Sequence, residues 1–484
     1  MSIRSALAYT FSTRYFSVAL QFIATIVLAR LLTPAEVGIY SVGAAVIMIA
    51  HTLRDFGTST YVIQEQNLSQ ARLGTAFTLT ILVAWVLALA LWLASTPIAI
   101  FYDEVGVGEV MTVMALNFAL IPFGSISMAL LRRAMNFRTI MFITVASTLV
   151  HSGTSVLFAA MGYGFISLAW GGVCGTLTTV LGTLIANPAG FFLKPGLSEL
   201  VHVLAFSMRS SVSSIASEAG HSAPDIVLGR TVGMEGTGLF SRAMGYVQLL
   251  ERLLQDVLRS VMLPYLSEVE RAGGDMRGKL IQVLDNVVSI SLFISGLTAV
   301  LAQPLIVLLF GTQWVAAVPL AQILCVAMVL RCVAPTLAAA LVASGRISLV
   351  MHNSLISTAL KFALLSISSR YGLLSGAIGF VVAETINLLV LLYFSNRSGL
   401  FLWSNYGSIV VKNIPIAAIG ILPAAIIMLF LRSPDRFFPL VGYLSVAGFI
   451  SAGVWLSGLV CFDRAPKEEF LRLFAAIKRK LHRD

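Results

Sequence analysis

Residues 26–41 read IVLARLLTPAEVGIYS, and residues 226–241 read IVLGRTVGMEGTGLFS. Six of the sixteen aligned positions are identical without a gap, at a spacing of 200 residues. Self-similarity of this kind is typical of an internal repeat. The sequence therefore predicts a chain built from two related halves, each of which carries one copy of this stretch.

The composition around the repeat is that of a membrane protein. Of 484 residues, 58% are apolar and 11% are Asp, Glu, Lys or Arg. A soluble domain carries about 25% charged residues. A soluble fold of this length would lack the polar surface that it needs. The composition therefore excludes a water-soluble multidomain enzyme, a nucleic-acid binder and a disordered protein.

Fourteen stretches are apolar enough for membrane helices, since about 20 residues span about 30 Å of hydrocarbon. Six of these helices separate the two repeat copies, so both copies enter the membrane in the same direction. The predicted fold class is an all-α polytopic membrane protein with two parallel six-helix lobes and two extra C-terminal helices. The fourteen stretches are residues 9–30, 37–62, 75–96, 109–131, 139–160, 163–186, 202–229, 237–264, 281–303, 316–343, 350–370, 373–395, 410–431 and 438–461.

The same spans define the predicted domains. They are an N-lobe at 1–187, a cytoplasmic linker at 188–201, a C-lobe at 202–395, two further helices at 396–461 and a tail at 462–484. The tail places apolar side chains on one helical face amid basic residues. We expect it to lie on the anionic inner leaflet, with docking of a partner as the alternative.

The distribution of basic residues predicts the orientation. Nineteen of the 32 Lys and Arg residues fall in the tail and the connections on the N-terminal side of the membrane, and five fall in the opposite loops. Cytoplasmic segments carry this excess, so both termini are expected inside the cell. Arg14 interrupts the first apolar stretch, and we therefore expect a membrane helix there and no cleaved signal peptide.

Eight basic residues fall within the predicted spans and away from their ends, and a charge at a helix centre costs about 2.5–3.5 kcal/mol. Fewer acids lie at similar depth, so the interior is expected to be net cationic and suited to an anionic solute that bears phosphate or uronate groups. The basic residues are Arg14, Arg54, Arg209, Arg242, Arg252, Arg259, Arg331 and Lys361, and the acids are Asp55, Glu218, Asp225, Glu251, Asp256 and Glu384.

Glu218, His221 and Asp225 follow one another at i, i+3 and i+7, on one helical face beside Pro224. Proline kinks a helix and frees backbone carbonyls, so this face is a candidate site for a coupling H⁺ or Na⁺. A salt bridge or a hydrogen-bonded packing contact is the alternative. The whole set of ion-coupling candidates is Asp55, Glu218, His221, Asp225, Asp256 and Glu384.

Other interior charges have structural interpretations as well. Arg252 and Asp256 are spaced for a salt bridge within one helix, and Arg259 can extend toward the inner surface. Lys361 and Glu384 lie at similar depth on either side of one turn, so we expect a structural ion pair first and pathway residues second.

No metal or organic cofactor is expected. The four cysteines lie in apolar stretches without a C-x-x-C pair, and no histidine has metal-ligand spacing from them. The sequence also lacks the G-x-x-x-x-G-K-[ST] loop of ATP-hydrolysing proteins. The chain is therefore not expected to be an enzyme. If an ion drives its activity, we expect that ion to be H⁺ or Na⁺.

Five stretches resemble the polysaccharide-transporter branch of the multidrug/oligosaccharidyl-lipid/polysaccharide exporter superfamily. They are Leu28–Tyr40, Asp55–Gly57, Leu130–Arg138, Gly238–Ala243 and Leu341–Arg346. The LLRRAMNFR stretch and the number of spans are more similar to colanic-acid or exopolysaccharide exporters than to the shorter O-antigen flippases.

The resemblance implies a Wzx-type flippase of the bacterial inner membrane. Such proteins move undecaprenyl-pyrophosphate-linked oligosaccharide units to the periplasmic leaflet by alternate opening of two lobes around a cationic cavity. The implied partners are this lipid-linked substrate, membrane lipids, and a polymerase and chain-length regulator of the same pathway, with no nucleic acid. Together with the interior charges, the resemblance makes Arg14, Arg54, Arg209, Arg242, Arg252 and Arg259 the substrate-binding candidates.

Three alternatives stay open. A multidrug antiporter of the same superfamily is disfavoured by the cationic interior, because its substrates are usually cations. A lipid II flippase or scramblase fits the same hydropathy. An integral-membrane polysaccharide polymerase, ligase or acyltransferase would need a sizeable external loop or a catalytic His/Asp motif.

Overall fold

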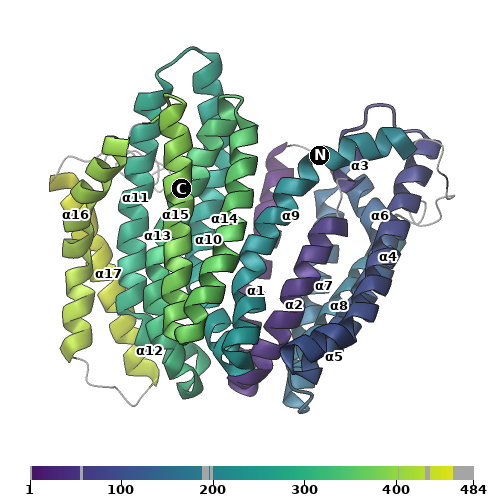
Figure 1. The fold of residues 1–484 in the computed structure, drawn as a ribbon, viewed down its shortest axis with the longest axis horizontal. Helices are drawn as coiled ribbons and strands as arrows, with labels where there is room; N and C mark the ends of the chain where they lie inside the picture. Colours follow the sequence, from purple (N-terminus) through teal and green to yellow (C-terminus); the bar gives the residue numbers. More distant parts are fainter. Residues whose placement is uncertain are drawn as a thin grey trace, which may run out of the picture. The chain divides into compact units, whose positions relative to one another are not determined.

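The computed structural model describes residues 3–54, 58–187, 196, 200–401, 403–430 and 437–461 (Figure 1). Within these residues the regular elements are helices and no strand occurs, which confirms the all-α fold class. The helices are α1 (Ile3–Leu31), α2 (Pro34–Arg54), α3 (Thr58–Gln64), α4 (Gln70–Tyr102), α5 (Val105–Leu120), α6 (Pro122–Arg133), α7 (Phe137–Ala160), α8 (Ile166–Ala186), α9 (Leu200–Thr231), α10 (Gly233–Arg271), α11 (Met276–Val300), α12 (Ala302–Phe310), η2 (Thr312–Ala317), α13 (Val318–Ala343), α14 (Ile347–Ser368), η3 (Ser369–Tyr371), α15 (Leu373–Arg397), α16 (Trp403–Phe430) and α17 (Phe437–Cys461).

Each predicted span coincides with one helix or with two consecutive helices. Eleven helices of the described chain are long and apolar enough to cross a membrane, or twelve if the bent pair α5–α6 is one span. Helices α9 and α10 are outside this set, and they carry most of the predicted interior charges. A polytopic membrane protein is confirmed, whereas the count of fourteen spans stays a prediction.

The chain divides into two compact units, which we call unit 1 (Met1–Ser241) and unit 2 (Arg242–Asp484). Unit 1 contains α1 to α9 and the first turns of α10, and unit 2 contains the rest. The division falls inside α10, directly after the second repeat copy. The lobe boundaries expected from the sequence stay a prediction.

The repeat stretch contains the start signal of α2. Thr33 donates its backbone N–H to Glu36 Oε2 at 2.8 Å, and Glu36 N–H donates to Thr33 Oγ1 at 3.3 Å. This reciprocal pair is a capping box, and Pro34 between them occupies the first helical position, where no N–H is needed. The TPAE segment therefore ends α1 and begins α2 within a few residues.

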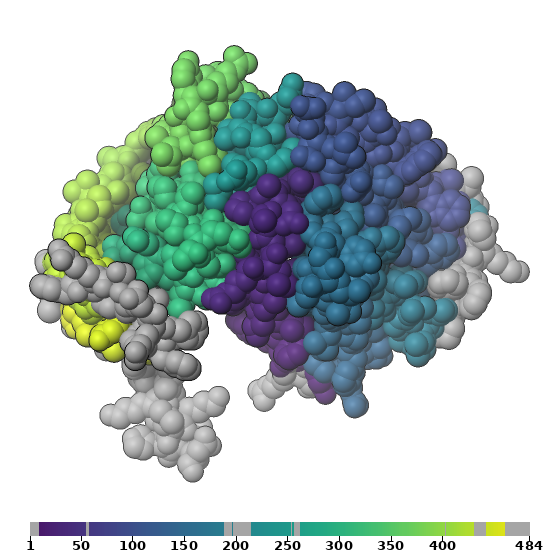
Figure 2. All heavy atoms as spheres, turned by 90° about the horizontal axis from the view of Figure 1, so that it is seen from below, coloured from purple at the N-terminus to yellow at the C-terminus, as the bar shows by residue number. Residues whose placement is uncertain are grey.

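In unit 1, α1 packs against α7, α2 packs against α5 and α9, and α7 and α8 form a hairpin. Figure 2 shows the purple atoms of the N-terminal helices beside the blue atoms of α7 and α8. The apolar core between α2 and α5 includes the fully buried Val42, Ile47, Val107, Met111 and Phe118. Close packing of these side chains holds α2 and α5 rigidly together, and α9 packs on α2.

Two breaks shape the spans. Helices α5 and α6 meet at an angle of 52°. The bend falls at Pro122, which begins α6 and cannot donate the backbone hydrogen bond that would continue α5. In unit 2, α12 ends at Gly311, whose φ of +103° is readily adopted only by glycine. The chain then turns directly into the short helix η2.

In unit 2, α13 packs against α11 and α15, and α15 also packs against α14. The two helices that follow the second predicted lobe pack elsewhere: α16 contacts α11 and α17. Phe293 of α11 stacks on Trp455 of α17, with ring centroids 4.7 Å apart and planes 7° apart. Helices α16 and α17 therefore extend unit 2 at the face of α11.

Candidate functional site

The two copies of the repeat stretch contact each other within unit 1. Ser41 Oγ donates a hydrogen bond to Ser241 Oγ at 3.0 Å. A Cβ on Gly38 would overlap the carbonyl oxygen of Met234, and a Cβ on Gly238 would overlap that of Pro34. The start of α2 thus crosses the start of α10 at backbone contact, with equivalent positions of the repeat facing each other.

Helix α9 packs beside this crossing. Tyr102 Oη of α4 donates a hydrogen bond to the carbonyl oxygen of Ile226 at 2.9 Å. A Cβ on Gly229 would contact Val42 and Tyr102, so this part of α9 lies directly against α2 and α4. The tight fit holds the second half of α9, including the residues after Pro224, in a defined position.

The predicted ion-coupling face lies on this helix. Glu218 is half-buried and His221 is exposed. Asp225 is half-buried, and its Oδ1 atom is buried without a hydrogen-bond partner among the described residues. The described residues contain no group of three or more His, Cys, Asp or Glu side chains suited to a metal ion.

Arg242 of α10 lies against two aromatic rings of unit 2. Its Cζ atom is 5.2 Å from the centroid of Phe310 and 4.8 Å from that of Trp314. The side chain is half-buried, and its Nε atom is buried without a hydrogen-bond partner within the described chain. Cation–π attraction therefore holds this guanidinium in place.

Two other interior cations of unit 2 form ion pairs. Lys361 Nζ is 2.9 Å from Glu384 Oε1, which confirms the structural ion pair expected from their depth. Arg331 Nε is 3.0 Å from Glu251 Oε1, and all four side chains are at most 13% exposed. These carboxylates compensate the positive charges of Arg331 and Lys361.

Amide side chains form hydrogen bonds to the carboxylates of both ion pairs. Gln255 donates to Glu251 Oε1 at 2.6 Å and to the carbonyl oxygen of Arg331 at 3.2 Å. Asn387 donates to Glu384 Oε2 at 3.3 Å and accepts from Asn353 at 2.8 Å. Hydrogen bonds of this kind are what a buried ion pair needs to offset its desolvation. Both groups therefore have the character of structural networks.

The other candidates are distributed over both units. Arg14 of α1 is exposed and Arg54 of α2 is half-buried, both in unit 1. Arg252 of α10 is exposed and donates to Gln248 Oε1 at 3.2 Å. The side chains of Arg209, Asp256 and Arg259, and the whole of Asp55, lie outside the described residues.

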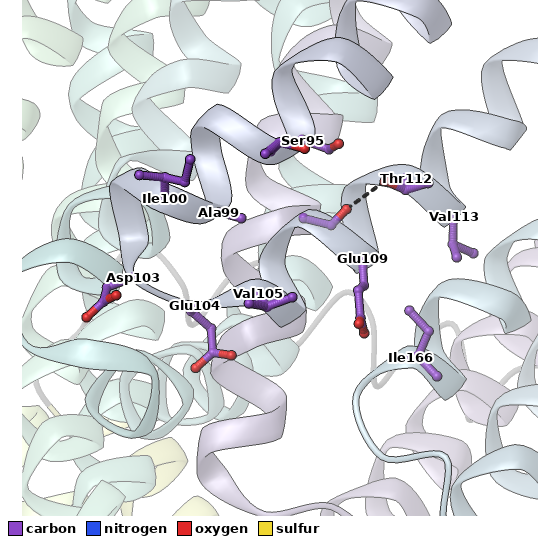
Figure 3. A pocket seen from close by; sticks show the side chains of 12 residues that line it. Ser95, Ala99, Ile100, Asp103, Glu104, Val105, Glu109, Thr112, Val113 and Ile166 are labelled. Carbon is purple, nitrogen blue, oxygen red and sulfur yellow. Dashed lines mark hydrogen bonds between the residues drawn. The ribbon is translucent and has the colours of Figure 1, made fainter.

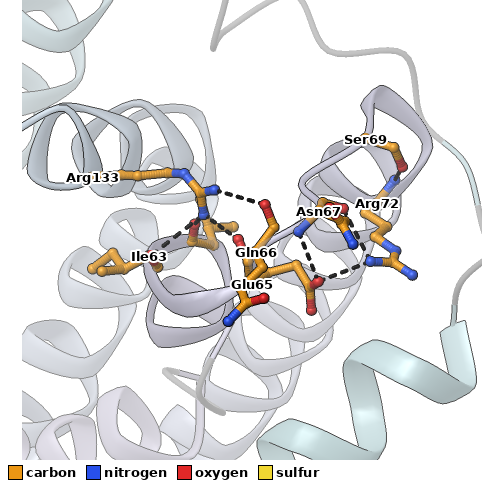
Figure 4. A network of polar contacts seen from close by, with 8 residues as sticks. Ile63, Glu65, Gln66, Asn67, Ser69, Arg72 and Arg133 are labelled. Carbon is orange, nitrogen blue, oxygen red and sulfur yellow. Dashed lines mark hydrogen bonds and ion pairs between the residues drawn. The ribbon is translucent and has the colours of Figure 1, made fainter.

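Arg133, which follows the predicted span 109–131, has a defined structural partner (Figure 4). Its guanidinium donates to the carbonyl oxygens of Val62 at 2.9 Å and of Glu65 at 2.5 Å, just where α3 ends. Nearby, Arg72 Nη1 is 2.9 Å from Glu65 Oε1. Arg133 therefore caps the C-terminus of α3, where unsatisfied carbonyls attract cations.

A cavity of about 700 Å³ lies between the end of α4 and the start of α5 (Figure 3). Asp103, Glu104 and Glu109 line it, and no basic side chain does within the described residues. Asp103 has a φ of +55° at the end of α4, and Glu104 accepts a hydrogen bond from Gly106 N–H at 3.3 Å. This cavity is acidic and does not suit an anionic ligand.

The sequence did not reveal the aromatic partners of Arg242 or the pairing of Arg331 with Glu251. Trp314 follows Arg242 by 72 positions in a segment with no recognisable motif. Glu251 and Arg331 lie on α10 and α13. No spacing rule connects residues on separate helices, so these contacts required the tertiary structure.

Comparisons with known proteins agree with this fold. The chain is 25% identical over 380 residues to the lipopolysaccharide biosynthesis protein WzxC of Escherichia coli (strain K12), covering 75% of each chain. It is 24% identical over 307 residues to the succinoglycan biosynthesis transport protein ExoT of Rhizobium meliloti (strain 1021), covering 63% of this chain and 62% of that one. The solved structure of the lipid II flippase MurJ in an inward closed conformation matches with a TM-score of 0.73 at 12% identity, over 94% of this chain and all of that one.

The match to MurJ establishes a shared fold. A family model described as polysaccharide biosynthesis protein matches residues 27–319, which is more than half of the chain and includes the second repeat copy and all but the first residue of the first copy. The resemblance expected from the sequence motifs is thereby confirmed. The chain belongs to the polysaccharide biosynthesis protein family.

Proposed function

We propose that the protein translocates undecaprenyl-pyrophosphate-linked oligosaccharide units of a surface polysaccharide across the bacterial inner membrane. The observation that carries the proposal is Arg242, a cation within the helices of unit 2 that rests on aromatic rings and has no carboxylate partner among the described residues. A diphosphate is a suitable partner for such a guanidinium. The relatives named for transport and for lipid II flipping support the same class of activity.

In this proposal the two predicted lobes open alternately toward the two sides of the membrane. The diphosphate binds interior arginines, the sugar is surrounded by water and the prenyl tail stays in lipid. The arginines proposed for this role are Arg14, Arg54, Arg209, Arg242, Arg252 and Arg259. Arg331 and Lys361 are excluded from the set because each has a carboxylate partner.

We also propose that H⁺ or Na⁺ binding resets the cycle, with Asp225 as the leading candidate and Glu218 and His221 beside it. Support comes from the buried Oδ1 of Asp225, which lacks a hydrogen-bond partner within the described chain. Asp225→Asn is expected to abolish the dependence of transport in proteoliposomes on an H⁺ or Na⁺ gradient. The control is Glu109→Gln, which changes an exposed acid of α5. Unchanged ion dependence in Asp225→Asn would remove the coupling role of this residue.

The proposed location is the inner membrane with both termini in the cytoplasm, and the proposed pathway partners are a polymerase and a chain-length regulator. Support for the orientation comes from the excess of Lys and Arg on one side of the predicted spans. A reporter that fluoresces only in the cytoplasm, fused after residue 484, should be active. An active periplasmic reporter at the same position would contradict the orientation.

The central experiment measures transfer of a fluorescent undecaprenyl-pyrophosphate-linked oligosaccharide between leaflets of proteoliposomes. The wild-type protein should accelerate transfer, and Arg242→Gln should reduce it by at least about tenfold, as expected when one charge-assisted contact is lost. The matched control is Arg230→Gln, because Arg230 also lies on an aromatic ring, Phe101 at 5.5 Å, but is exposed at the end of α9.

The same vesicles separate the alternatives. Export of organic cations without transfer of the lipid-linked oligosaccharide would identify a multidrug antiporter. Transfer of lipid II alone would identify a lipid II flippase. Elongation of the saccharide chain would identify a polymerase or ligase, and we propose transport without catalysis.

A further inference from the structure

The contact of Arg242 with Trp314 and Phe310 is built by a specific local structure. Helix α12 ends with Phe310, and Gly311 adopts a φ of +103° that turns the chain into η2. Trp314, in the middle of η2, is 0% exposed, and Phe310 is 3% exposed. Two large buried rings thus lie against Arg242, with centroids 4.8 and 5.2 Å from its Cζ.

Arg242, Arg331 and Lys361, three of the interior cations of unit 2, are held in two different ways. Arg331 and Lys361 are held by the carboxylates of Glu251 and Glu384. These contacts use N–H donors and cancel the positive charge. Arg242 is held by ring faces, which attract the cation through the quadrupole of the ring and accept no classical hydrogen bond. No carboxylate of the described chain therefore compensates its positive charge, which remains for an anionic ligand.

Rigid support also reduces the entropic cost of binding. An arginine side chain has several rotatable bonds, and part of its rotamer entropy is lost when a ligand fixes it. Contact with two buried rings restricts the side chain before a ligand arrives. Pre-organised donors bind an anion more tightly than mobile donors of the same charge.

We infer that Trp314, together with Phe310, is a positioning residue that holds Arg242 ready to bind an anionic group of the transported molecule. This inference rests on the proposed function and deepens it. The ligand chemistry is a phosphate or carboxylate oxygen, which a saccharide lipid supplies either in its diphosphate or in a uronate sugar. Trp314 itself acts through Arg242 and has no direct role in recognising the anion.

Binding is tested on the purified full-length protein in detergent, using the shift in melting temperature with inorganic pyrophosphate and, separately, with glucuronate. The wild-type protein should bind at least one of them. Arg242→Gln should lose that binding, Trp314→Leu should weaken it by about tenfold, and Trp314→Phe, which keeps a ring, by about threefold or less. The stronger of the two probes identifies the diphosphate or the uronate as the anion.

Trp455 provides the matched control. It is also a buried tryptophan of unit 2, and it stacks on Phe293 of α11. Trp455→Leu should lower the melting temperature without changing the affinity for either anion. Phe310→Leu removes the other ring and supplies a second variant if Trp314→Leu does not accumulate.

The inference is overturned if the wild-type protein binds neither anion, or if Trp314→Leu and Phe310→Leu bind as tightly as the wild-type protein. It is also overturned if Trp455→Leu weakens binding as much as Trp314→Leu does. Its failure is distinct from failure of the proposed function. If the protein moves the lipid between leaflets but anion binding does not depend on Trp314, the proposed function stands and the inference fails. If anion binding depends on Trp314 but the lipid does not move between leaflets, the inference stands and the proposed function fails.

Discussion

Ser41 Oγ and Ser241 Oγ are 3.0 Å apart, although 200 residues separate them in the chain. They are equivalent positions of the internal repeat. Each lies three residues after a glycine, Gly38 or Gly238, that contacts the other helix. The repeat therefore has a structural consequence. The conserved spacing within each copy allows the start of α2 and the start of α10 to cross with approximate two-fold symmetry.

The crossing requires glycine at positions 38 and 238. Gly38→Ala or Gly238→Ala places a methyl group on a backbone carbonyl, and we expect a loss of about 1–3 kcal/mol in the free energy of unfolding. Equilibrium unfolding in mixed micelles checks this value. Gly245→Ala in α10 is the control, because nothing lies within 4 Å of its added Cβ. Alanine there should be neutral or slightly stabilising, and an equal loss in all three variants would contradict the explanation.

A covalent bond at the crossing tests whether it must open. The side chains of Ser41 and Ser241 are close enough for a disulfide in the double variant Ser41→Cys with Ser241→Cys. Oxidation should stop leaflet transfer, and reduction should restore it, because alternate opening would require these helix starts to separate. Each single cysteine variant is the control. Full transfer by the oxidised double variant would mean that the crossing stays closed throughout the cycle.

The pair of Lys361 and Glu384 should respond differently to single and double changes. Lys361→Met leaves a buried carboxylate without its cation and should cost about 3–5 kcal/mol of stability. Lys361→Met combined with Glu384→Leu removes both charges and should recover most of that loss. The melting temperature and the yield of folded protein measure both. If the double variant were the less stable one, the pair would contribute more than charge compensation.

Arg133 should be important for the end of α3. Arg133→Ala removes charge-assisted hydrogen bonds to backbone carbonyls, with an expected loss of about 1.5–3 kcal/mol. Arg133→Lys should restore only part of it, since an ammonium has no second nitrogen to replace Nη2, which donates to the carbonyl oxygen of Gln66 at 3.5 Å. Hydrogen exchange of the amides at 58–64 reports the local effect. Arg132→Ala, at the exposed neighbouring position, should leave this exchange unchanged.

Much of the fold was predictable because membrane helices follow a local rule of length and apolarity. The predicted spans coincide with helices even at α9 and α10, which carry most of the interior charges. The bend between α5 and α6 follows from Pro122, but its angle of 52° depends on the packing of both halves. The pair of Lys361 and Glu384 was predictable because both residues lie near one turn.

The sequence by itself determined the all-α membrane architecture, the internal repeat and the set of charges inside the spans, since each depends on composition or on short-range spacing. Only the tertiary structure decided which of those charges are compensated. Arg331 meets Glu251 and Arg242 meets Trp314 across different helices, and such contacts depend on helix rotation and packing. The sequence thus shows that a charge lies inside a span. Whether a carboxylate neutralises that charge or aromatic rings contact it depends on side chains that are distant along the chain.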